Sequence, residues 1–489
     1  MAYRQCHKRL WLEVHRKELR DDSGSEMAFA IGYEVGDVSQ DIYNEEGNAV
    51  LIDIEELGFS KAFAESAKHL QDGSRIVFEA GMQAAGALAF ADVMIPEKTD
   101  EGVSWRMVEV KASTSVKEIY HDDIAVQNFV AESAGIKLSS ISLAHVDNQF
   151  VYQGDGDYKG LLYEVDLTDD ARSRRDEVAG WLDDAQTVVK MTAEPEVETG
   201  DHCSQPYDCP FIGHCNRDEE EVRFPLSSLP NFRNPKKANI IAQGIEDLRE
   251  VPNEYLSAPQ LRVKDQSLLG EAYFDQEGAT NALANLGYPA FFLDFETVML
   301  AVPIWKGTRP YQQIPFQYSL HHLYESDETQ HEAFLDLSGS DPSGSLASSL
   351  IKACGSTGPV FVYNAGFEKR VMRELAERFP EYADGLTAII ERVVDLLPVA
   401  RNHYYHPDQH GSWSLKAVLP AICPDLSYGD LDGVSDGGMA VEAYKEILLP
   451  GTTDVRKQEI EEQLLTYCEL DTLALVRIWE KFRGGNVEK

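Results

Sequence analysis

Hydrophobic and polar positions divide the chain into two mixed α/β regions separated by a proline-rich segment. In the first 215 residues, apolar residues at helical spacing predict helices, and short apolar runs between them predict strands. The predicted helices cover residues 26–43, 57–70 and 122–134, and the predicted strands cover 75–79, 86–95, 105–112 and 140–145. The block from Cys203 to Cys215 contains two prolines and a glycine and is predicted to be a turn-rich loop.

The second half of the chain repeats this alternation after a connector. Residues 216–285 are rich in proline and charge and predict a small ordered bridge, with short helices at 240–250 and 258–269. Beyond it we expect strands at 291–297, 314–324, 330–337 and 359–363, helices at 346–354 and 367–379, a strand or helix start at 392–397, and one or two helices over 453–482. The sequence therefore predicts an α/β protein with mixed sheets flanked by helices, in domains 1–215 and 286–489 joined by connector 216–285.

Size, charge and hydropathy narrow the class of protein. A chain of 489 residues exceeds what one hydrophobic core usually organises. No uncharged apolar run is long enough to span a membrane, and the first residues lack an apolar signal core, so we expect a cytoplasmic protein without a membrane partner. With 83 acidic and 44 basic residues, the chain should repel polyanions at long range. A nucleic-acid partner would need bound cations and local basic clusters, of which the sequence offers Lys8, Arg9, Arg16, Lys17 and Arg20, and Lys369, Arg370 and Arg373.

The first candidate site combines carboxylates with a lysine. Glu109 and Lys111 are two apart in a predicted strand and therefore share a face, and Asp92 ends the preceding apolar run. Two carboxylates on one sheet edge suit Mg²⁺, and a nearby lysine can stabilise charge developing on a phosphate. Glu79 could join the acids, and Gln127 could face the same cleft from the following helix. The alternative is an amphipathic strand with a solvated Glu–Lys pair.

The cysteines form the second candidate site. Cys203, Cys209 and Cys215 are spaced C-x5-C-x5-C, and Cys6 could supply a fourth thiolate. Such a set completes a tetrahedral zinc site or holds an iron–sulfur cluster, and the wide spacing favours the cluster. His202 and His214 are possible ligands if the metal is zinc. Three unrelated thiols are the alternative, and the remaining cysteines, Cys354, Cys423 and Cys468, have apolar neighbours and are predicted to be core thiols.

A third candidate site is built from acids far apart in the sequence. Asp294 and Glu296 share a strand face, Glu368 opens a helix, and Tyr467 and Asp471 are one helical turn apart. Four packed carboxylates would repel one another, and two divalent ions about 3.5–4 Å apart would remove the repulsion and form a phosphoryl-transfer site. Tyr467 is placed to orient or deprotonate the attacking water. The alternative is an edge carboxylate pair with two unrelated, solvated or satisfied acids.

Three histidines lie between these acids, in a loop rich in tyrosine, proline and glycine. His403, His406 and His410 have no regular ligand spacing. We therefore expect the loop to line the substrate cleft rather than to bind a metal.

The N-terminal residues resemble the RecB-like branch of the PD-(D/E)XK nucleases, in particular the CRISPR-associated adaptation nuclease that carries a four-cysteine [4Fe–4S] cluster. The resemblance covers residues 6–215 and implies a restriction-endonuclease-like fold. It assigns the metal-binding acids to Asp92 and Glu109, the lysine to Lys111 and the motif glutamine to Gln127. It assigns the cluster ligands to Cys6, Cys203, Cys209 and Cys215. The chain departs from the family by lacking the upstream histidine and by its stretched cysteine spacing.

The C-terminal residues resemble the tyrosine-type DEDD exonucleases, which have an RNase H-like fold. The resemblance covers about 289–482, with Asp294 and Glu296 in the first motif, Asn364-Ala-Gly-Phe-Glu368 in the second and Tyr467-x-x-x-Asp471 in the third. Glu368 stands where the family has aspartate. Val394-Asp395-Leu and Ser414-Leu-Lys resemble the segment between the second and third motifs. The whole chain is similar to a bacterial family that fuses the two modules.

Together the resemblances imply a nuclease that uses Mg²⁺ or Mn²⁺ at two sites, one of them a 3′–5′ exonuclease. They also imply a [4Fe–4S] cluster, with zinc as the alternative, and a nucleic-acid partner, DNA being favoured over RNA. Two other functions remain open from the sequence. One is a protein that binds nucleic-acid ends with one degenerate site, and the other is a cluster-containing structural or redox partner.

Overall fold

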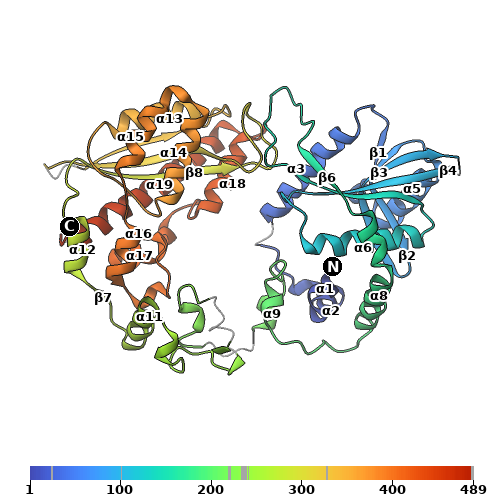
Figure 1. Ribbon diagram of the computed structural model, residues 1–489, viewed down its shortest axis with the longest axis horizontal. Coiled ribbons are helices and arrows are strands. Elements are labelled where there is room, and N and C mark those ends of the chain that lie inside the picture. Colours follow the sequence, from blue (N-terminus) through green and yellow to red (C-terminus); the bar gives the residue numbers. More distant parts are fainter. Residues whose placement is uncertain are drawn as a thin grey trace. The chain divides into compact units, whose positions relative to one another are not determined.

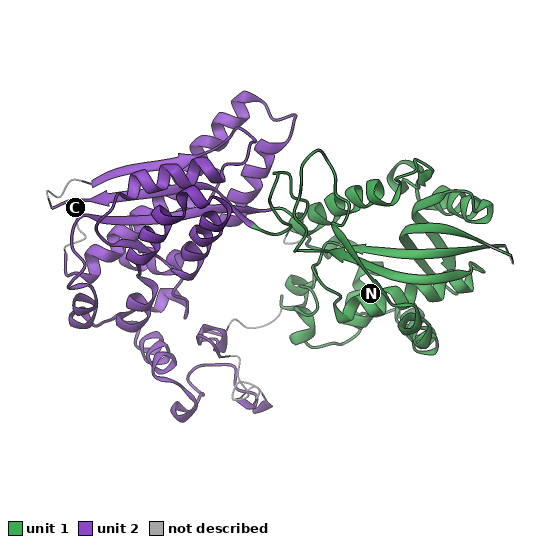
Figure 2. Ribbon diagram, turned by 45° about the horizontal axis from the view of Figure 1, so that its top comes forward, with its two compact units in different colours: residues 1–220, 300–312 green, residues 221–299, 313–489 purple. Residues whose placement is uncertain are grey.

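The computed structural model describes residues 1–23, 26–100, 102–217, 222–232, 239–240, 242–325 and 329–485 (Figure 1). The chain forms two compact units, which Figure 2 distinguishes by colour. Unit 1 comprises Met1–Glu220 and Leu300–Gln312, and unit 2 comprises Glu221–Met299 and Gln313–Lys489. Both are α/β with a mixed sheet flanked by helices, so the predicted fold class is confirmed.

Unit 1 is built on a six-stranded sheet in the order β1-β2-β3-β4-β5-β6. The strands are β1 Ala49–Leu51, β2 Ile76–Ala84, β3 Ala87–Thr99, β4 Gly102–Lys111, β5 Leu138–Val146 and β6 Leu162–Asp166. The β1–β2 and β4–β5 pairs are parallel, and the other neighbours are antiparallel. Helix α6 (Glu118–Ser133) makes the crossover from β4 to β5, as a parallel pair requires. The register that places the site is Val93 opposite Val108 on β3 and β4.

The helices of unit 1 cover its sheet and tie the chain's start to the end of the unit. They are α1 Ala2–Gln5, α2 His7–His15, α3 Glu26–Tyr43, α4 Ile54–Leu57, α5 Phe59–Asp72, α6, α7 Thr168–Ser173, α8 Arg175–Val189 and α9 Ile212–Cys215. Trp11 and Leu12 of α2 are buried against Val188 of α8 and against Cys209 and Phe211. Residues 6–12 therefore pack beside the cysteine loop although almost 200 residues separate them in the sequence.

The segment 300–312 belongs to unit 1, although the residues on both sides of it belong to unit 2. Ala301 and Val302 are buried with Val35 of α3, Val146 and Leu161. The predicted domain boundaries assign these residues to the C-terminal domain and separate the connector from it. In the structure the connector groups with unit 2, because contact with distant apolar residues, not sequence order, decides each grouping.

Unit 2 has a five-stranded sheet in the order β10-β9-β8-β11-β12. The strands are β8 Ala290–Met299, β9 Gln313–Leu323, β10 Thr329–Leu335, β11 Val360–Val362 and β12 Val393–Asp395. The first three pair antiparallel, and β8, β11 and β12 pair parallel. Asp294 lies opposite Ser319 and Glu296 opposite Gln317. A small second sheet pairs β13 (Tyr404–Tyr405) with β7 (Tyr273–Phe274).

Helices cover both faces of this sheet (Figure 1). They are α11 Ala258–Leu269, α12 Gln276–Leu283, α13 Ser343–Cys354, α14 Gly366–Arg378, α15 Ala383–Arg392, α16 Leu397–His403, α17 Leu415–Ile422, α18 Gly437–Leu448 and α19 Asp454–Phe482. Leu346, Val371 and Leu386 of α13, α14 and α15 form a core with Leu293 and Leu320 of the sheet. Helix α19 packs against β8 and β9 and brings the third motif to the sheet.

The predicted elements differ from the observed ones in specific places. The helices predicted at 26–43 and 258–269 coincide with α3 and α11, and 453–482 forms the single helix α19. The helix predicted at 240–250 is wrong for residues 243–250, which form turns. There the amide of Leu248 donates a hydrogen bond to Phe224 O, and Asp247 forms an isolated β-bridge with Pro225, so these bonds replace helical ones. Ile241, within the predicted helix, lies outside the described residues. Among the helices described, none is long and apolar enough to cross a membrane.

Candidate active sites and a four-cysteine pocket

The first acidic cluster lies where β2, β3 and β4 of unit 1 meet. The β3–β4 register ends with Val93 opposite Val108, so Asp92 and Glu109 are the next residues along the two strands. An oxygen of Asp92 accepts a 2.6 Å hydrogen bond from the Val110 amide. Glu79 lies on β2 between the pairs that flank Asp92, and its φ of 55° is left-handed, an arrangement that costs energy for any residue other than glycine. Such strain concentrates at functional sites.

Lys111 and helix α6 complete this cluster. Lys111 Nζ lies 2.5 Å from Glu109 Oε1 and 2.9 Å from Asp123 Oδ2. Gln127 Nε2 donates a 2.7 Å hydrogen bond to Glu109 Oε2. The structure thus brings Glu79, Asp92, Glu109, Lys111 and Gln127 together. Asp123 was not predicted from the sequence, although it precedes Gln127 by one helical turn, a spacing that indicates a shared helix face.

The charges in this cluster are unbalanced. Burial and the neighbouring Glu109 raise the pKa of Glu79 to about 7. Burial is also the main cause that raises the pKa of Asp92 to about 7 and that of Glu109 to about 8, with Glu79 and Asp92 respectively adding to it. Burial alone would lower the pKa of Lys111, but Glu109, Asp123 and Asp92 raise it, so the amine stays protonated. One ammonium group faces several buried carboxyls, which suits a divalent cation.

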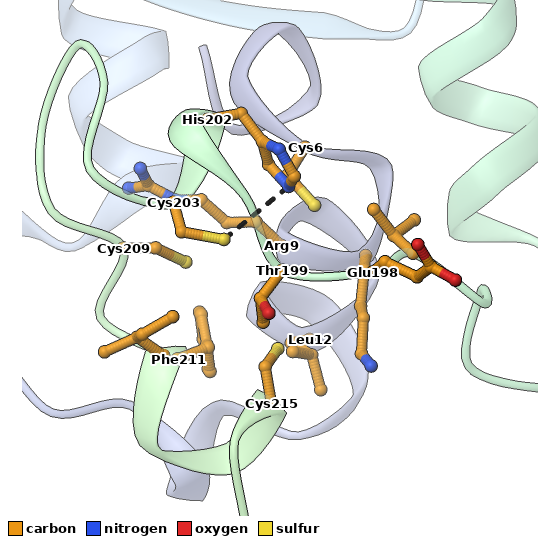
Figure 3. A pocket seen from close by; sticks show the side chains of 13 residues that line it. Cys6, Arg9, Leu12, Glu198, Thr199, His202, Cys203, Cys209, Phe211 and Cys215 are labelled. Atoms are coloured by element: carbon orange, nitrogen blue, oxygen red, sulfur yellow. Dashed lines mark hydrogen bonds between the residues drawn. The ribbon is translucent and has the colours of Figure 1, made fainter. Parts of the chain in front are cut away.

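Four cysteines from the two ends of unit 1 line one pocket (Figure 3). Cys6 lies between α1 and α2, Cys203 ends a short helical turn, Cys209 follows in the loop, and Cys215 ends α9. The loop is closed by a 2.7 Å hydrogen bond from the Cys209 amide to the Cys203 carbonyl. Figure 3 shows their side chains around a common space that His202 and Phe211 also border. All four are free cysteines.

Basic residues of α2 surround this pocket. Burial raises the pKa of Cys209 and of Cys215, while Arg9 opposes the rise at Cys209 and Lys8 opposes it at Cys215. Cys6 and Cys203 also add to the raised pKa of each of these two thiols, so the four groups are close enough to interact electrostatically. Bound thiolates carry negative charge, which Lys8 and Arg9 would partly balance.

The two histidines of this loop have different neighbours. His202 Nε2 lies 3.6 Å from Cys203 Sγ, so it is close to the pocket's sulfurs. His214 Nε2 instead contacts Glu194 at 3.1 Å. Glu194 also forms a 2.9 Å ion pair with Lys8. His202 is therefore the better placed of the two for a ligand role.

The second acidic cluster lies between β8 and α19 in unit 2. Asp294 and Glu296 share one face of β8, and Phe295 on the other face is buried. Helix α19 brings Tyr467, Cys468 and Asp471 to the acidic side. One oxygen of Asp294, one of Glu296 and the sulfur of Cys468 all lie within 4.8 Å of one another. Cys468, predicted to be a core thiol, is fully buried but sits among the acids.

Burial and mutual repulsion shift the acids of this cluster. Burial, Asp471 and Glu296 raise the pKa of Asp294 well above its usual range. Burial and Asp471 raise the pKa of Glu296 to about 8. Burial raises the pKa of Asp471 to about 6, although Tyr428 and Lys416 oppose the rise. Carboxyls held this way are poised for a divalent cation, which would favour their charged forms.

Two side chains that complete this site come from the start of α17 and from the short 3₁₀ turn Tyr428–Asp430. Tyr428 donates a 2.5 Å hydrogen bond to Asp471 Oδ1. Lys416 Nζ lies 5.2 Å from the ring centre of Tyr428 and 5.4 Å from that of Tyr467. In the sequence Lys416 is recognisable only as part of the Ser414-Leu-Lys motif, and nothing there indicates Tyr428, which lies in a short turn 43 residues before its partner. No helical or strand spacing relates the two.

Glu368 occupies a position of its own at this site. It lies in the first turn of α14 and is close enough to add to the raised pKa of Asp294. Burial, with Asp395 as a further cause, raises the pKa of Glu368 itself to about 8. Asp395 accepts hydrogen bonds of 3.0 Å from the amides of Asn364 and Ala365 and so fixes the loop before α14. Glu368 therefore borders the cluster around Asp294. It is not one of the three residues whose ligand atoms lie within 4.8 Å of one another, which are Asp294, Glu296 and Cys468.

The cleft beside these acids has a wall made by the connector. Its lining includes residues of 226–232 and 257–260, together with the loop 410–414 and the start of α17. A Cβ on Gly411, at φ 78°, would lie 1.6 Å from the Ser228 carbonyl oxygen, so only glycine allows this contact. Gln260 Nε2 donates a 2.9 Å hydrogen bond to Pro230 O and secures the same wall. The sequence predicted only an ordered bridge for these connector residues.

The histidine loop is divided between the cleft and the scaffold. His410 lines the cleft and has a left-handed φ of 46°. His403 Nδ1 contacts Asp275 Oδ2 at 2.9 Å, and His406 Nδ1 accepts a hydrogen bond from the Asp408 amide at 3.2 Å. The expected cleft position is observed for His410, whereas His403 contacts the Asp275 carboxylate and His406 caps the short turn that follows it.

Residues 291–414 match a family model described as a domain of unknown function (DUF2779). The matched range contains β8 with Asp294 and Glu296, and α14 with Glu368, whereas Tyr467 and Asp471 lie beyond it. A comparison of the chain with curated proteins finds no match.

Proposed function

We propose that this chain is a metal-dependent nuclease that hydrolyses phosphodiester bonds at two sites, one in each unit. Unit 2 would be a 3′–5′ exonuclease of the DEDD type, and unit 1 a PD-(D/E)XK nuclease. The observation that carries the proposal is the convergence of Asp294 and Glu296 with Asp471, nearly 180 residues away, in a buried cluster beside an open cleft. The strand order of unit 2, with its antiparallel first three strands and parallel last two, supports an RNase H-like fold.

The residues present fit divalent cations at both sites. Each site gathers carboxyls whose pKa burial and mutual repulsion raise, and carboxylate oxygens are the ligands that Mg²⁺ and Mn²⁺ prefer. Asp294, Glu296 and Asp471 would hold the ions in unit 2, with Glu368 at the border of the site. Asp92 and Glu109, with Glu79 beside them, would hold them in unit 1. Bound ions would polarise the phosphodiester and make water a better nucleophile.

In unit 2, the chain's own residues would position the attacking water and the substrate. Tyr467 shares the cleft with the acids, and burial and Asp471 raise its pKa, so its hydroxyl stays protonated and orients water by hydrogen bonding. Tyr428 holds Asp471 in place through its 2.5 Å hydrogen bond. Lys416 also lines the cleft and provides positive charge for a phosphate among acidic neighbours.

In unit 1, Lys111 would have the corresponding electrostatic role. Its ammonium lies between Glu109 and Asp123 and could turn towards a phosphate that displaces one of these contacts. Gln127 fixes the Glu109 carboxylate by donating to its second oxygen. The two sites would therefore act independently, since each has its own acids and its own lysine.

We also propose that Cys6, Cys203, Cys209 and Cys215 hold a [4Fe–4S] cluster, with a zinc ion as the alternative. Four thiols around one pocket, with Lys8 and Arg9 next to them, fit an anionic thiolate-ligated group. Among the residues that the structure describes, these four sulfurs are not all within 4.8 Å of one another. A single tetrahedral zinc ion would hold its ligand atoms closer than that, so the wider spacing favours the cluster. When bound, the group would fasten the start of the chain to the end of unit 1.

The proposed substrate is nucleic acid, with DNA favoured, and the proposed location is the cytoplasm. Because the net charge of −39 disfavours polyanions, bound divalent ions and lysines at the sites would have to supply local attraction. One observation favours a second candidate function, a protein that binds nucleic-acid ends. Glu368 stands where the DEDD exonucleases have an aspartate, and Asp395 contributes to its raised pKa. With this ligand altered, unit 2 would hold a nucleic-acid end without cutting it.

Cleavage of end-labelled DNA and RNA tests the proposal. The full-length protein would be assayed with Mg²⁺ or Mn²⁺, as wild type and as the single variants Asp294→Asn and Glu109→Gln. We expect Asp294→Asn to abolish stepwise shortening from the 3′ end and Glu109→Gln to abolish the other activity. Binding without metal-dependent products in the wild type would favour the end-binding function, and cleavage indifferent to both substitutions would refute the nuclease proposal.

A further inference from the structure

The acidic cluster of unit 2 contains one ligand atom that is not an oxygen. Cys468 Sγ lies within 4.8 Å of both an Asp294 oxygen and a Glu296 oxygen. Cys468 precedes Asp471 by three residues on α19, so the two side chains share one face of the helix. The sulfur therefore belongs to the group of side chains that faces β8.

The distances suit joint coordination of one ion. Carboxylate oxygens lie about 2.0–2.2 Å and thiolate sulfurs about 2.3 Å from a bound Zn²⁺. Two ligands of one tetrahedral ion are therefore separated by about 3.5 Å. The three atoms, which lie within 4.8 Å of one another, would have to close in by about 1 Å at most, a distance that side-chain rotation can supply. Burial and the neighbouring Asp294, Glu296 and Asp471 raise the pKa of this thiol well above its ordinary value in the ion-free protein, so the geometry and not the free thiol's acidity carries the assignment.

Unpartnered oxygens beside the cluster point independently to a missing ligand. Gln317 lies opposite Glu296 in the strand register and faces α19, where its Nε2 donates 2.8 Å to Leu464 O. Its Oε1 is buried, and no hydrogen-bond partner for it exists among the described residues. The same holds for Glu368 Oε2, at 2% exposure. Buried polar atoms are nearly always satisfied, so the unpartnered Glu368 Oε2, on a residue close enough to raise the pKa of Asp294, is available to a cation bound there.

We propose that Cys468 is a ligand, with Asp294 and Glu296, of a divalent ion in unit 2, and that its sulfur makes this site select Mn²⁺, Co²⁺ or Zn²⁺ over Mg²⁺. The inference rests on the proposed function and specifies the metal that this function uses. Mg²⁺ demands oxygen ligands in octahedral geometry, whereas thiolates favour softer ions such as Zn²⁺. Coordination replaces the thiol proton, which leaves to solvent, so binding should release a proton.

Cobalt binding to the full-length protein tests this assignment. Co²⁺ would be titrated into wild type, Cys468→Ser and Asp294→Asn, and difference absorption would record the charge-transfer band that a thiolate ligand gives. Cys423→Ser is the matched control, because Cys423 is another buried thiol of unit 2 and lies outside the acidic cluster. We expect the band in wild type and Cys423→Ser, and its loss in Cys468→Ser and in Asp294→Asn. Calorimetry should show Mn²⁺ binding to unit 2 weakened at least about tenfold by Cys468→Ser, and Mg²⁺ binding much less affected.

The outcomes separate this inference from the proposed function. In one outcome, Co²⁺ binds in an Asp294-dependent way but gives no thiolate charge-transfer band. In another, its Asp294-dependent band persists in Cys468→Ser. Either result overturns the role of Cys468 and leaves the nuclease proposal standing. Absence of any Asp294-dependent ion overturns both. Bands from the unit 1 thiols are recognised because Asp294→Asn retains them. If Cys468→Ser fails to fold, ¹¹³Cd NMR spectra of wild type and Asp294→Asn replace it. We expect one resonance that Asp294→Asn lacks, with a chemical shift typical of mixed sulfur and oxygen ligands. A chemical shift typical of oxygen ligands alone would contradict the assignment.

Discussion

Replacing Glu296 by glutamine should stabilise the metal-free protein at pH 8 and remove its response to Mn²⁺. Burial and Asp471 raise the pKa of Glu296 from an ordinary value of 4.5 to about 8. Because the folded state holds this proton more tightly than the unfolded state, the free energy of unfolding falls as pH rises from about 4.5 to about 8. Over that range the loss is on the order of 4 kcal/mol. Glutamine carries no charge at any pH and avoids this loss.

Calorimetric melting of the chelator-treated protein measures the effect. At pH 8 the unit 2 transition of Glu296→Gln should lie higher than that of wild type, by up to roughly 10 °C for a unit of this size. Well below pH 4.5 the difference should vanish, because Glu296 is then protonated in both states. Mn²⁺ should raise the wild-type transition at pH 8 and leave the variant's almost unchanged. Glu462→Gln, an exposed position on the same helix α19, is the control and should match wild type throughout.

Two results would refute this reasoning. Equal transitions for Glu296→Gln and wild type at pH 8 in chelator would show that the buried charge is not destabilising. Equal stabilisation of both proteins by Mn²⁺ would show that the ion binds elsewhere.

Three further outcomes follow from the same structure. Gly411→Ala, whose Cβ would lie 1.6 Å from Ser228 O, should displace the connector wall, destabilise unit 2 by about 2 kcal/mol and raise KM for single strands more than it lowers kcat. The control Gly437→Ala, which has open space around it, should leave the cleavage kinetics unchanged. Equal kinetics for the two variants would count against a role of the wall in substrate binding. Lys111→Met should abolish unit 1 cleavage and spare 3′ trimming in the same labelled-strand assay, whereas loss of both activities would contradict independent sites. Cys209→Ser should lose bound iron and brown colour and lower the melting temperature of unit 1, while Cys354→Ser, in the core of unit 2, should keep the iron; iron retained in Cys209→Ser would contradict the cluster ligands.

Local periodicity was sufficient to place most of the acids. Strand alternation put Asp294 and Glu296 on one face, and helical spacing put Tyr467 and Asp471 on another, as the structure has them. Both patterns depend only on the backbone geometry within one element. The same reasoning placed Glu109 and Lys111 together in unit 1.

Contacts between distant segments could not be predicted in this way. Tyr428 reaches Asp471 from a short turn, and the connector reaches the cleft through Gly411, with no spacing in the sequence to indicate either. Cys468 illustrates a different limit, because its apolar neighbours predicted a core thiol. It is indeed buried, but α19 turns it towards the acids, which only the packing of α19 on β8 determines.

The central claim is that acids distant in sequence converge into two separate sites that hold divalent ions. Electron paramagnetic resonance of Mn²⁺ under equilibrium binding tests it most directly, because free and bound Mn²⁺ are counted in wild type, Asp294→Asn, Glu109→Gln and the double variant. We predict that each single variant loses part of the bound Mn²⁺ and that the double variant loses the sum of the two parts. Bound Mn²⁺ that is the same in all four proteins would contradict the claim.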